Sequence, residues 1–221
     1  MQLDFSIILG YLPMFGEGLL VTLKVTFCAL LLGLVLSVPL SLCKISYIRV
    51  LQLFASFYTS IFRGVPIMVQ VFMMYFGIPL VTGLKFTAFS AGTIVFAMNS
   101  AAYISESMRG GIMAIDRGQY EAAMALGVRY PSMMKDIILP QAIKSILPSL
   151  VNEFIGLLKN TTLIASIGLV DILRVGQLIQ GATYRAFEPF FVISLFYYVL
   201  VMALSSMGKL LERWVNKSDR G

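Results

Sequence analysis

Long apolar runs separated by short polar stretches dominate this chain. A helix that crosses a bilayer needs about 20 mostly apolar residues, and we find five runs near that length. They cover residues 25–42, with an earlier start near Gly18, and residues 51–80, 88–108, 143–170 and 190–211. The second run is interrupted by Arg63-Gly64-Val65-Pro66. The pattern predicts an all-α polytopic membrane protein with about five transmembrane helices, folded as one domain over residues 1–221.

The composition agrees with a membrane protein. Of the 221 residues, 58% are hydrophobic and 13% are charged, whereas roughly a quarter of a soluble domain is charged. The first charged residues, Asp4 and Glu17, are acidic, but a cleaved signal starts with basic residues. We therefore expect Met1 to be the mature start and all the apolar runs to be retained.

The basic residues indicate how the chain is oriented. With five crossings, eleven lysines and arginines fall in loops on one side and four on the other; Arg63 and Lys159 lie inside spans and complete the 17. Because basic residues concentrate in cytoplasmic loops, we expect a cytoplasmic C-terminus and an external N-terminus. The loop of residues 110–143 would also be cytoplasmic.

Several chemistries are missing from the sequence. There is no histidine, so we expect no metal site of the usual kind. Cys28 and Cys43 would lie about 22 Å apart on one helix, too far to form a disulfide. No basic and aromatic stripe suggests nucleic acid as a partner. No G-x-x-x-x-G-K-[S/T] phosphate loop occurs either, so any energy from ATP must come through another chain.

The loop of residues 110–143 carries helix signals although it is too polar for a bilayer. Asp116 can cap a helix, with Gln119 three residues later at the capping-box spacing. Gly127 suits the position after the helix end, where a positive φ is favoured. Pro131 fits the first turn of a second helix, and Leu139-Pro140 should break or kink it.

The first of these two helices would be too short to stand alone. About ten residues are marginal as an isolated helix in water, so this one must pack on something. Its small alanines allow close approach, and we expect its site to lie on another protein. The alternative is a plain linker between two spans, but such a linker is usually only a few residues long.

The loop resembles the signature loop of the membrane subunits of bacterial ABC importers. The matching residues are Glu121-Ala122-Ala123, Gly127, Ile137 and Leu139-Pro140. Other stretches resemble the polar amino-acid branch of that family: residues 63–66 with Gln70, residues 99–103 with Glu106, residues 109–112, residues 140–142, residues 152–154 and residues 158–162. Two departures, Val65 for a common Thr and Val151 for an occasional Gly, leave the choice of substrate in doubt.

The resemblance implies a set of partners and a location. Glu121, Ala122, Ala123 and Gly127 would belong to a coupling helix that docks on a separate ATP-binding cassette subunit. ATP and Mg would be bound by that subunit, with no cofactor in this chain. An extracytoplasmic solute-binding protein would deliver an amino acid outside, near Lys85 and residues 171–187. The chain would lie in the lipid of the bacterial cytoplasmic membrane, beside a second copy or a paralogous permease.

Polar residues inside the predicted spans are candidates for substrate binding. A charge at mid-bilayer costs about 2.5–3.5 kcal/mol on insertion scales, so such charges are usually paired or functional. Glu153 could hold an ammonium group, or it could pair with Arg63 or Lys159. Six residues form the expected substrate set: Asn99, Ser100, Tyr103, Glu153, Lys159 and Thr162.

For some of these residues a structural role is the alternative. Asn99 and Tyr103 share one helix face at i and i+4, yet polar groups in spans often only bond neighbouring helices. Thr162 could bond back to its own helix. We expect Glu106 to form a salt bridge with Arg109 at i+3.

The function that we expect is import of polar amino acids, driven by ATP. Glu153 favours a cationic substrate such as arginine, lysine or histidine, while glutamine and cystine stay open. An ion-coupled secondary carrier would also explain the buried charges, but it would have no use for a capped helix in a loop. A membrane enzyme ranks last, since we find neither a Gly-x-Ser-x-Gly elbow nor a carboxylate dyad.

Overall fold

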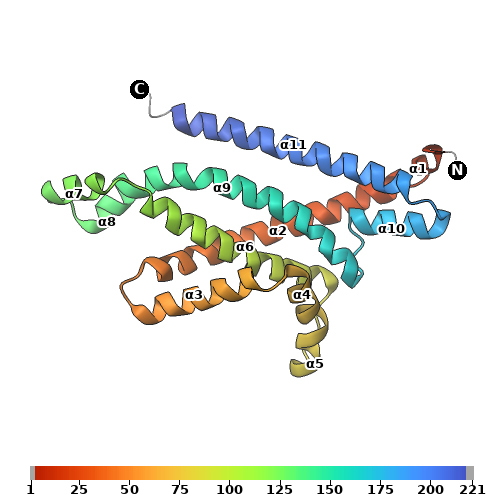
Figure 1. Cartoon of the computed structure of the whole chain (residues 1–221), viewed down its shortest axis with the longest axis horizontal. Helices are drawn as coiled ribbons and strands as arrows, with labels where there is room; N and C mark the ends of the chain where they lie inside the picture. Colours follow the sequence, from red (N-terminus) through yellow and green to blue (C-terminus); the bar gives the residue numbers. More distant parts are fainter. Residues whose placement is uncertain (1–2, 218–221) are drawn as a thin grey trace.

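The computed structural model describes residues 3–217, and the side chains of residues 3–215; Met1, the expected mature start, lies outside them. The described chain is helical, as the sequence predicts (Figure 1). Its elements are α1 (Ser6–Leu9), α2 (Leu12–Ile45), α3 (Arg49–Gly64), α4 (Ile67–Phe72), η1 (Met73–Gly77), α5 (Ile78–Thr82), α6 (Ala88–Met113), α7 (Arg117–Ala125), α8 (Tyr130–Ser132), η2 (Met133–Ile138), α9 (Leu139–Asn160), η3 (Thr161–Ile167), α10 (Ile172–Thr183) and α11 (Phe187–Lys217).

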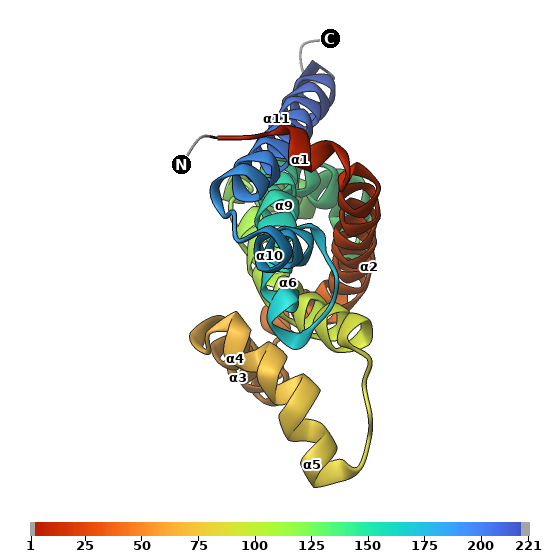
Figure 2. The same ribbon diagram turned by 90° about the vertical axis from the view of Figure 1, so that its right-hand side faces the viewer.

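The long helices α2, α6, α9 and α11 run along the long axis of the molecule (Figure 1). One end of this bundle carries α7, α8, the turn between α2 and α3, and the last turns of α11. The other end carries α1 and α10. The arm formed by α4, η1 and α5 projects sideways out of the bundle (Figure 2).

Helix α6 lies at the centre of the bundle, packed against α2, α3 and α9. Small residues dominate its buried positions, including Ala91, Gly92, Ser100, Ala101 and Ala102. Small side chains let helices approach closely, which drives helix association in membranes where the hydrophobic effect does not. Because its neighbours enclose α6, it can carry polar residues that a lipid-facing helix could not.

Length and composition identify fewer crossings than the five apolar runs suggest. Among the described residues, two helices qualify as membrane spans, Leu12–Ile45 and Phe187–Val215. Up to four qualify if each of two bent helix pairs counts as one span. The third predicted span coincides with α6, which is helical and long but too polar to be among them.

The second predicted span, residues 51–80, is broken sharply. Arg49–Gly64 and Ile67–Thr82 meet at 101°. Val65 and Pro66 between them have ψ of 134° and 132°, outside the helical region. A residue that precedes proline is pushed away from the helical conformation, so the Val65-Pro66 pair explains the break.

At Leu139-Pro140, where we expected a break or a kink, the helix does not break. Leu139 keeps helical dihedral angles, and α8, η2 and α9 follow one another without a gap. The turn before Pro140 is a π-helix, Met133–Ile138. Its i→i+5 hydrogen-bond pattern widens the helix. Pro140 has no backbone N–H and its ring crowds the preceding turn, and we infer that the wider turn makes room for it.

The end of the fourth predicted span also differs from expectation. Helix α9 ends at Asn160 and continues as a 3₁₀-helix to Ile167, after which Gly168 has φ of 86°. Residues 172–183, expected in an external loop, form α10, which packs against α2 and α11. Asp171 is fully buried and caps α10 by accepting a hydrogen bond from the Arg174 backbone N–H at 2.8 Å.

We predict that Gly33→Leu destabilises the fold while Gly16→Leu on the same helix does not. A Cβ at Gly33 would lie 3.0 Å from Ser100 Cβ and 3.1 Å from the Ala97 carbonyl oxygen, whereas a Cβ at Gly16 meets nothing within 4 Å. Both changes gain the same helix propensity, so their difference reports the clash, about 1–3 kcal/mol. Thermal unfolding in detergent, monitored as the fraction of protein that stays monodisperse, measures the difference in stability between the two variants. Equal unfolding midpoints would contradict the close packing of α2 on α6.

Candidate functional site

A cavity of about 430 Å³ opens where α3 breaks into α4. Its walls come from the α3–α4 junction, from α6 and from α9. The lining residues are Phe62, Arg63, Gly64, Val65, Pro66, Ile67, Asn99, Tyr103, Glu153, Gly156 and Asn160. The cavity therefore joins three of the predicted substrate residues, Asn99, Tyr103 and Glu153, to the broken second helix.

Hydrogen bonds to the exposed carbonyls hold the broken end of α3. The Asn99 side-chain N–H donates to the Phe62 carbonyl at 2.6 Å. The Gln70 side chain donates to Phe62 at 3.1 Å and to Val65 at 2.8 Å. The last carbonyls of a helix have no partner within the helix, so Asn99 and Gln70 supply partners for the carbonyls of Phe62 and Val65 at the break.

The two charged residues of the cavity do not neutralise each other. The Arg63 guanidinium lies over the Tyr103 ring, 4.9 Å from its centroid. Ser100, buried behind the lining, donates to Glu153 Oε1 at 2.7 Å. Among residues 3–215, Glu153 forms no ion pair with Arg63 or Lys159, so neither pairing considered from the sequence is present.

Two of the predicted substrate residues lie apart from this cavity. Lys159 is exposed and does not line it. The Thr162 hydroxyl donates to the Lys159 carbonyl at 2.8 Å, which is the back-bonding within its own helix considered above. The structure thus brings together Asn99, Ser100, Tyr103 and Glu153, and it leaves out Lys159 and Thr162.

The predicted loop helix is α7. The Asp116 carboxylate caps it by accepting from the Gly118 backbone N–H at 2.6 Å. The reciprocal half of a capping box is not formed; the carboxamide of Gln119 faces that of Gln141 instead, 3.5 Å away. Gly127 follows the helix with φ of 71°, the conformation expected of that position.

The surface of α7 differs in part from the alanine face that we expected. Ala123 is buried and packs in a small core with Met133 and Ile138. Glu121, Ala122 and the neighbouring Met124 and Leu126 are exposed, with Leu126 at 83%. The spacing of the alanines did not predict that Met124 and Leu126 would be part of the exposed surface. Two exposed apolar side chains on a capped helix indicate a surface suited to burial against another chain.

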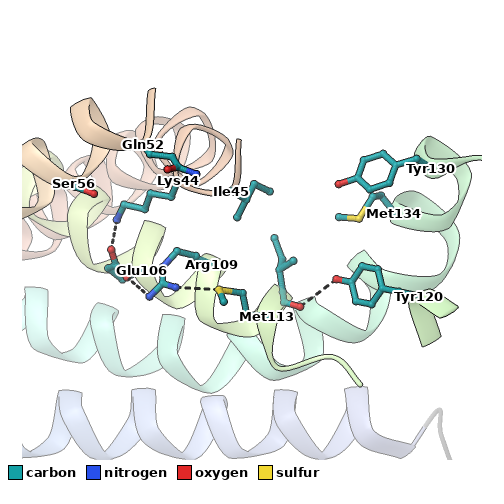
Figure 3. Close-up of a pocket in the computed structure, with 11 residues that line it drawn as sticks. Lys44, Ile45, Gln52, Ser56, Glu106, Arg109, Met113, Tyr120, Tyr130 and Met134 are labelled. Atoms are coloured by element: carbon teal, nitrogen blue, oxygen red, sulfur yellow. Dashed lines mark hydrogen bonds and ion pairs between the residues drawn. The ribbon is translucent and has the colours of Figure 1, made fainter. Parts of the chain in front are cut away.

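Charged residues near the C-terminal end of α6 form a compact ion network beside this loop. Glu106 pairs with Arg109 at 3.0 Å, as predicted, and also with Lys44 at 2.6 Å (Figure 3). Lys44 lies 62 residues away in sequence, so no local spacing could have revealed it. Asn99, Tyr103 and Glu106 follow at four- and three-residue spacings, hence on one face of α6.

Comparisons with known proteins agree with these features. The family model described as "Binding-protein-dependent transport system inner membrane component" matches residues 29–217. The arginine transport system permease protein ArtQ of Bacillus subtilis is 47% identical over 99% of this chain and 100% of its own length. A putative glutamine transport system permease protein GlnP of Rickettsia bellii is 49% identical over 89% of this chain and 90% of its own.

Solved structures have the same fold. A chain from the crystal structure of an amino acid ABC transporter with histidines matches with a TM-score of 0.92 and 42% identity, over 96% of this chain and 99% of that one. A chain of the inward-facing MetNI methionine ABC transporter matches with a TM-score of 0.79 and 20% identity, over 93% and 98%. By its family match and its near full-length relatives, this chain belongs to the binding-protein-dependent transport system inner membrane components, the permease subunits of ABC importers.

Proposed function

We propose that this chain is the permease subunit of an ATP-driven importer of polar amino acids, with cationic ones favoured. The observation that carries the proposal is the cavity at the α3–α4 break. It offers the carboxylate of Glu153, which pairs with no cation among residues 3–215, together with the guanidinium of Arg63 and the amide of Asn99. Such a set complements the ammonium and carboxylate of an amino acid.

The relatives' names support this substrate class. Arginine and glutamine appear in the names of the two sequence relatives, and histidines in that of the solved transporter. All three are polar amino acids, and arginine carries a cationic side chain. Glu153 is the one carboxylate among the lining residues, and in a cationic amino acid it can hold the side-chain cation in place of the α-ammonium. On this ground we favour the cationic members of the class.

The same proposal assigns α7 as the coupling helix. Glu121, Ala122, Ala123 and Gly127 belong to it or to its end, and Met124 and Leu126 offer apolar area for a socket on an ATP-binding cassette subunit. ATP and Mg are bound by that subunit. The chain lies in the bacterial inner membrane, its N-terminus outside, with α7 and the C-terminus in the cytoplasm, because basic residues gather at that end.

A second permease completes the pathway, either a copy of this chain or a paralogue. The α4–η1–α5 arm exposes Leu80 and Val81 at 87% each, and apolar area of this kind is covered by lipid or by a partner. An extracytoplasmic solute-binding protein delivers the amino acid at the end that carries α1 and α10. No nucleic acid takes part.

Uptake by the reconstituted complex tests the function. We expect proteoliposomes that contain the permease and its ATP-binding subunits to accumulate labelled arginine only with ATP and the cognate binding protein. Uptake driven by an ion gradient without ATP, and abolished by an ionophore, would instead support a secondary carrier.

Within this complex, we predict that Glu153→Gln lowers the uptake of arginine about tenfold or more. The substitution keeps the hydrogen bond from Ser100 but removes the charge, and a hydrogen bond to a charged group contributes about 1.5–3 kcal/mol. Lys159→Gln, on the same helix but outside the cavity, serves as the matched control. If both variants transport like the parent protein, Glu153 is not on the path.

We further predict that Gly127→Val uncouples ATP hydrolysis from uptake, whereas Gly127→Asn does so much less. Gly127 has φ of 71°, which a β-branched residue adopts only with strain and asparagine tolerates better. The ratio of ATP hydrolysed to arginine imported measures the effect. An unchanged ratio in Gly127→Val would exclude α7 as the coupling element.

A further inference from the structure

A second, larger cleft of about 630 Å³ lies at the end of the bundle that carries α7 and α8. One wall is the turn region of α2 and α3, with Lys44 and Gln52 (Figure 3). Tyr120 and Tyr130 stand on the opposite wall, and α6 contributes Arg109 between them. The amino-acid cavity described above shares none of these residues.

The charges in this cleft do not balance. Lys44 Nζ donates to Glu106 at 2.6 Å and to the Ser105 hydroxyl at 2.7 Å. Arg109 donates through Nε and Nη2 to the other oxygen of Glu106, at 3.1 and 3.0 Å. Two cations thus share one carboxylate, and the network keeps a net charge of +1. The Lys44 side chain is only 4% exposed while that of Arg109 is 38% exposed, so Arg109 presents the excess charge to the cleft.

The guanidinium of Arg109 also has a poorly matched partner. Its Nη1 donates to the sulfur of Met113 at 3.0 Å (Figure 3). A thioether is a weak acceptor, whereas an anionic oxygen forms one of the strongest hydrogen bonds that arginine makes. An anion in the cleft would therefore replace a weak contact with a strong one and leave the bonds to Glu106 intact.

Size and surroundings narrow the class of anion. The cleft is far larger than a carboxylate, and Gln52, Ser56 and Tyr130 line it with groups that can bond ester oxygens or hydroxyls. Arginine is the preferred partner of phosphate because its donors match the geometry of the oxygens. Under the orientation proposed above, this end of the bundle is the cytoplasmic one, on the side where the membrane leaflet carries anionic lipids.

We propose that this cleft is a binding site for a phosphate ester, held by Arg109, with a glycerol-type group against Gln52, Ser56 and Tyr130. The phosphate can come from the headgroup of an anionic phospholipid or from a free phosphate ester. Either ligand would contact both the α2–α3 turn and the α7–α8 region, and would thereby restrict the position of the loop that carries α7.

Two measurements on the purified assembled complex distinguish the sources. In the first, nanodiscs of phosphatidylcholine alone, or of an equal mixture with phosphatidylglycerol, are analysed by native mass spectrometry for lipid retained per permease chain. In the second, glycerol 3-phosphate is titrated into the complex in phosphatidylcholine nanodiscs and binding is followed by calorimetry.

Arg109→Gln should weaken binding of the anion about tenfold, because the anion loses one hydrogen bond from a charged donor. Ser56→Asp should do the same by adding a negative charge to the cleft without touching the ion network, which guards against a folding defect in the first variant. Arg49→Gln removes an equal charge from an exposed residue of α3 that does not line the cleft, and it should bind like the parent chain.

Selective loss of phosphatidylglycerol in the two cleft variants would support a lipid headgroup. Selective loss of glycerol 3-phosphate binding, with lipid retention unchanged, would support a free phosphate ester. If the parent complex binds neither, or if Arg49→Gln loses as much as Arg109→Gln, the proposal is wrong.

Discussion

The hydrogen bond from the Asn99 side chain to the Phe62 carbonyl is the contact on which the candidate site depends. A helix that breaks inside a membrane exposes carbonyl groups that water cannot reach, and each unsatisfied group costs several kcal/mol. Asn99 on α6 and Gln70 on α4 donate hydrogen bonds to two of these carbonyls, those of Phe62 and Val65. The break borders the cavity, and these hydrogen bonds fix the position of two of its carbonyls there.

Helix α6 connects the two cavities of this chain. Asn99 and Tyr103 line the one at the α3–α4 break, and Glu106 and Arg109 belong to the other. The two cavities therefore share one rigid element, α6, although they share no lining residue. Its small buried residues pack closely against α2 and α9.

The sequence alone predicts much of the fold, for physical reasons that are local. Apolar runs reveal helices because lipid demands them, and Asp116 and Gly127 reveal the ends of α7 because caps depend on neighbouring residues. The pair of Glu106 with Arg109 follows from helical spacing. Of the candidate site, Asn99, Ser100, Tyr103 and Glu153 were recognised by being polar in apolar surroundings.

Features that depend on distant contacts could not be predicted in the same way. The approach of Lys44 to Glu106 requires the packing of α2 on α6. The angle of 101° at Val65-Pro66 depends on where the arm finds support, although the proline itself signals a break. Polarity alone likewise did not predict that Glu153 faces the cavity while Lys159 faces away from it. The side of a helix that faces a cavity is set by the packing of the neighbouring helices.

The π-helical turn at Met133–Ile138 has a geometric consequence for the rest of the chain. One additional residue in a turn offsets the register of a helix by about 100°. Residues before Met133 therefore point in a different direction, relative to α9, from the one that a regular α-helix would give them. The direction in which the connection to α7 leaves α9 therefore depends on this π-helical turn as well as on the length of the loop.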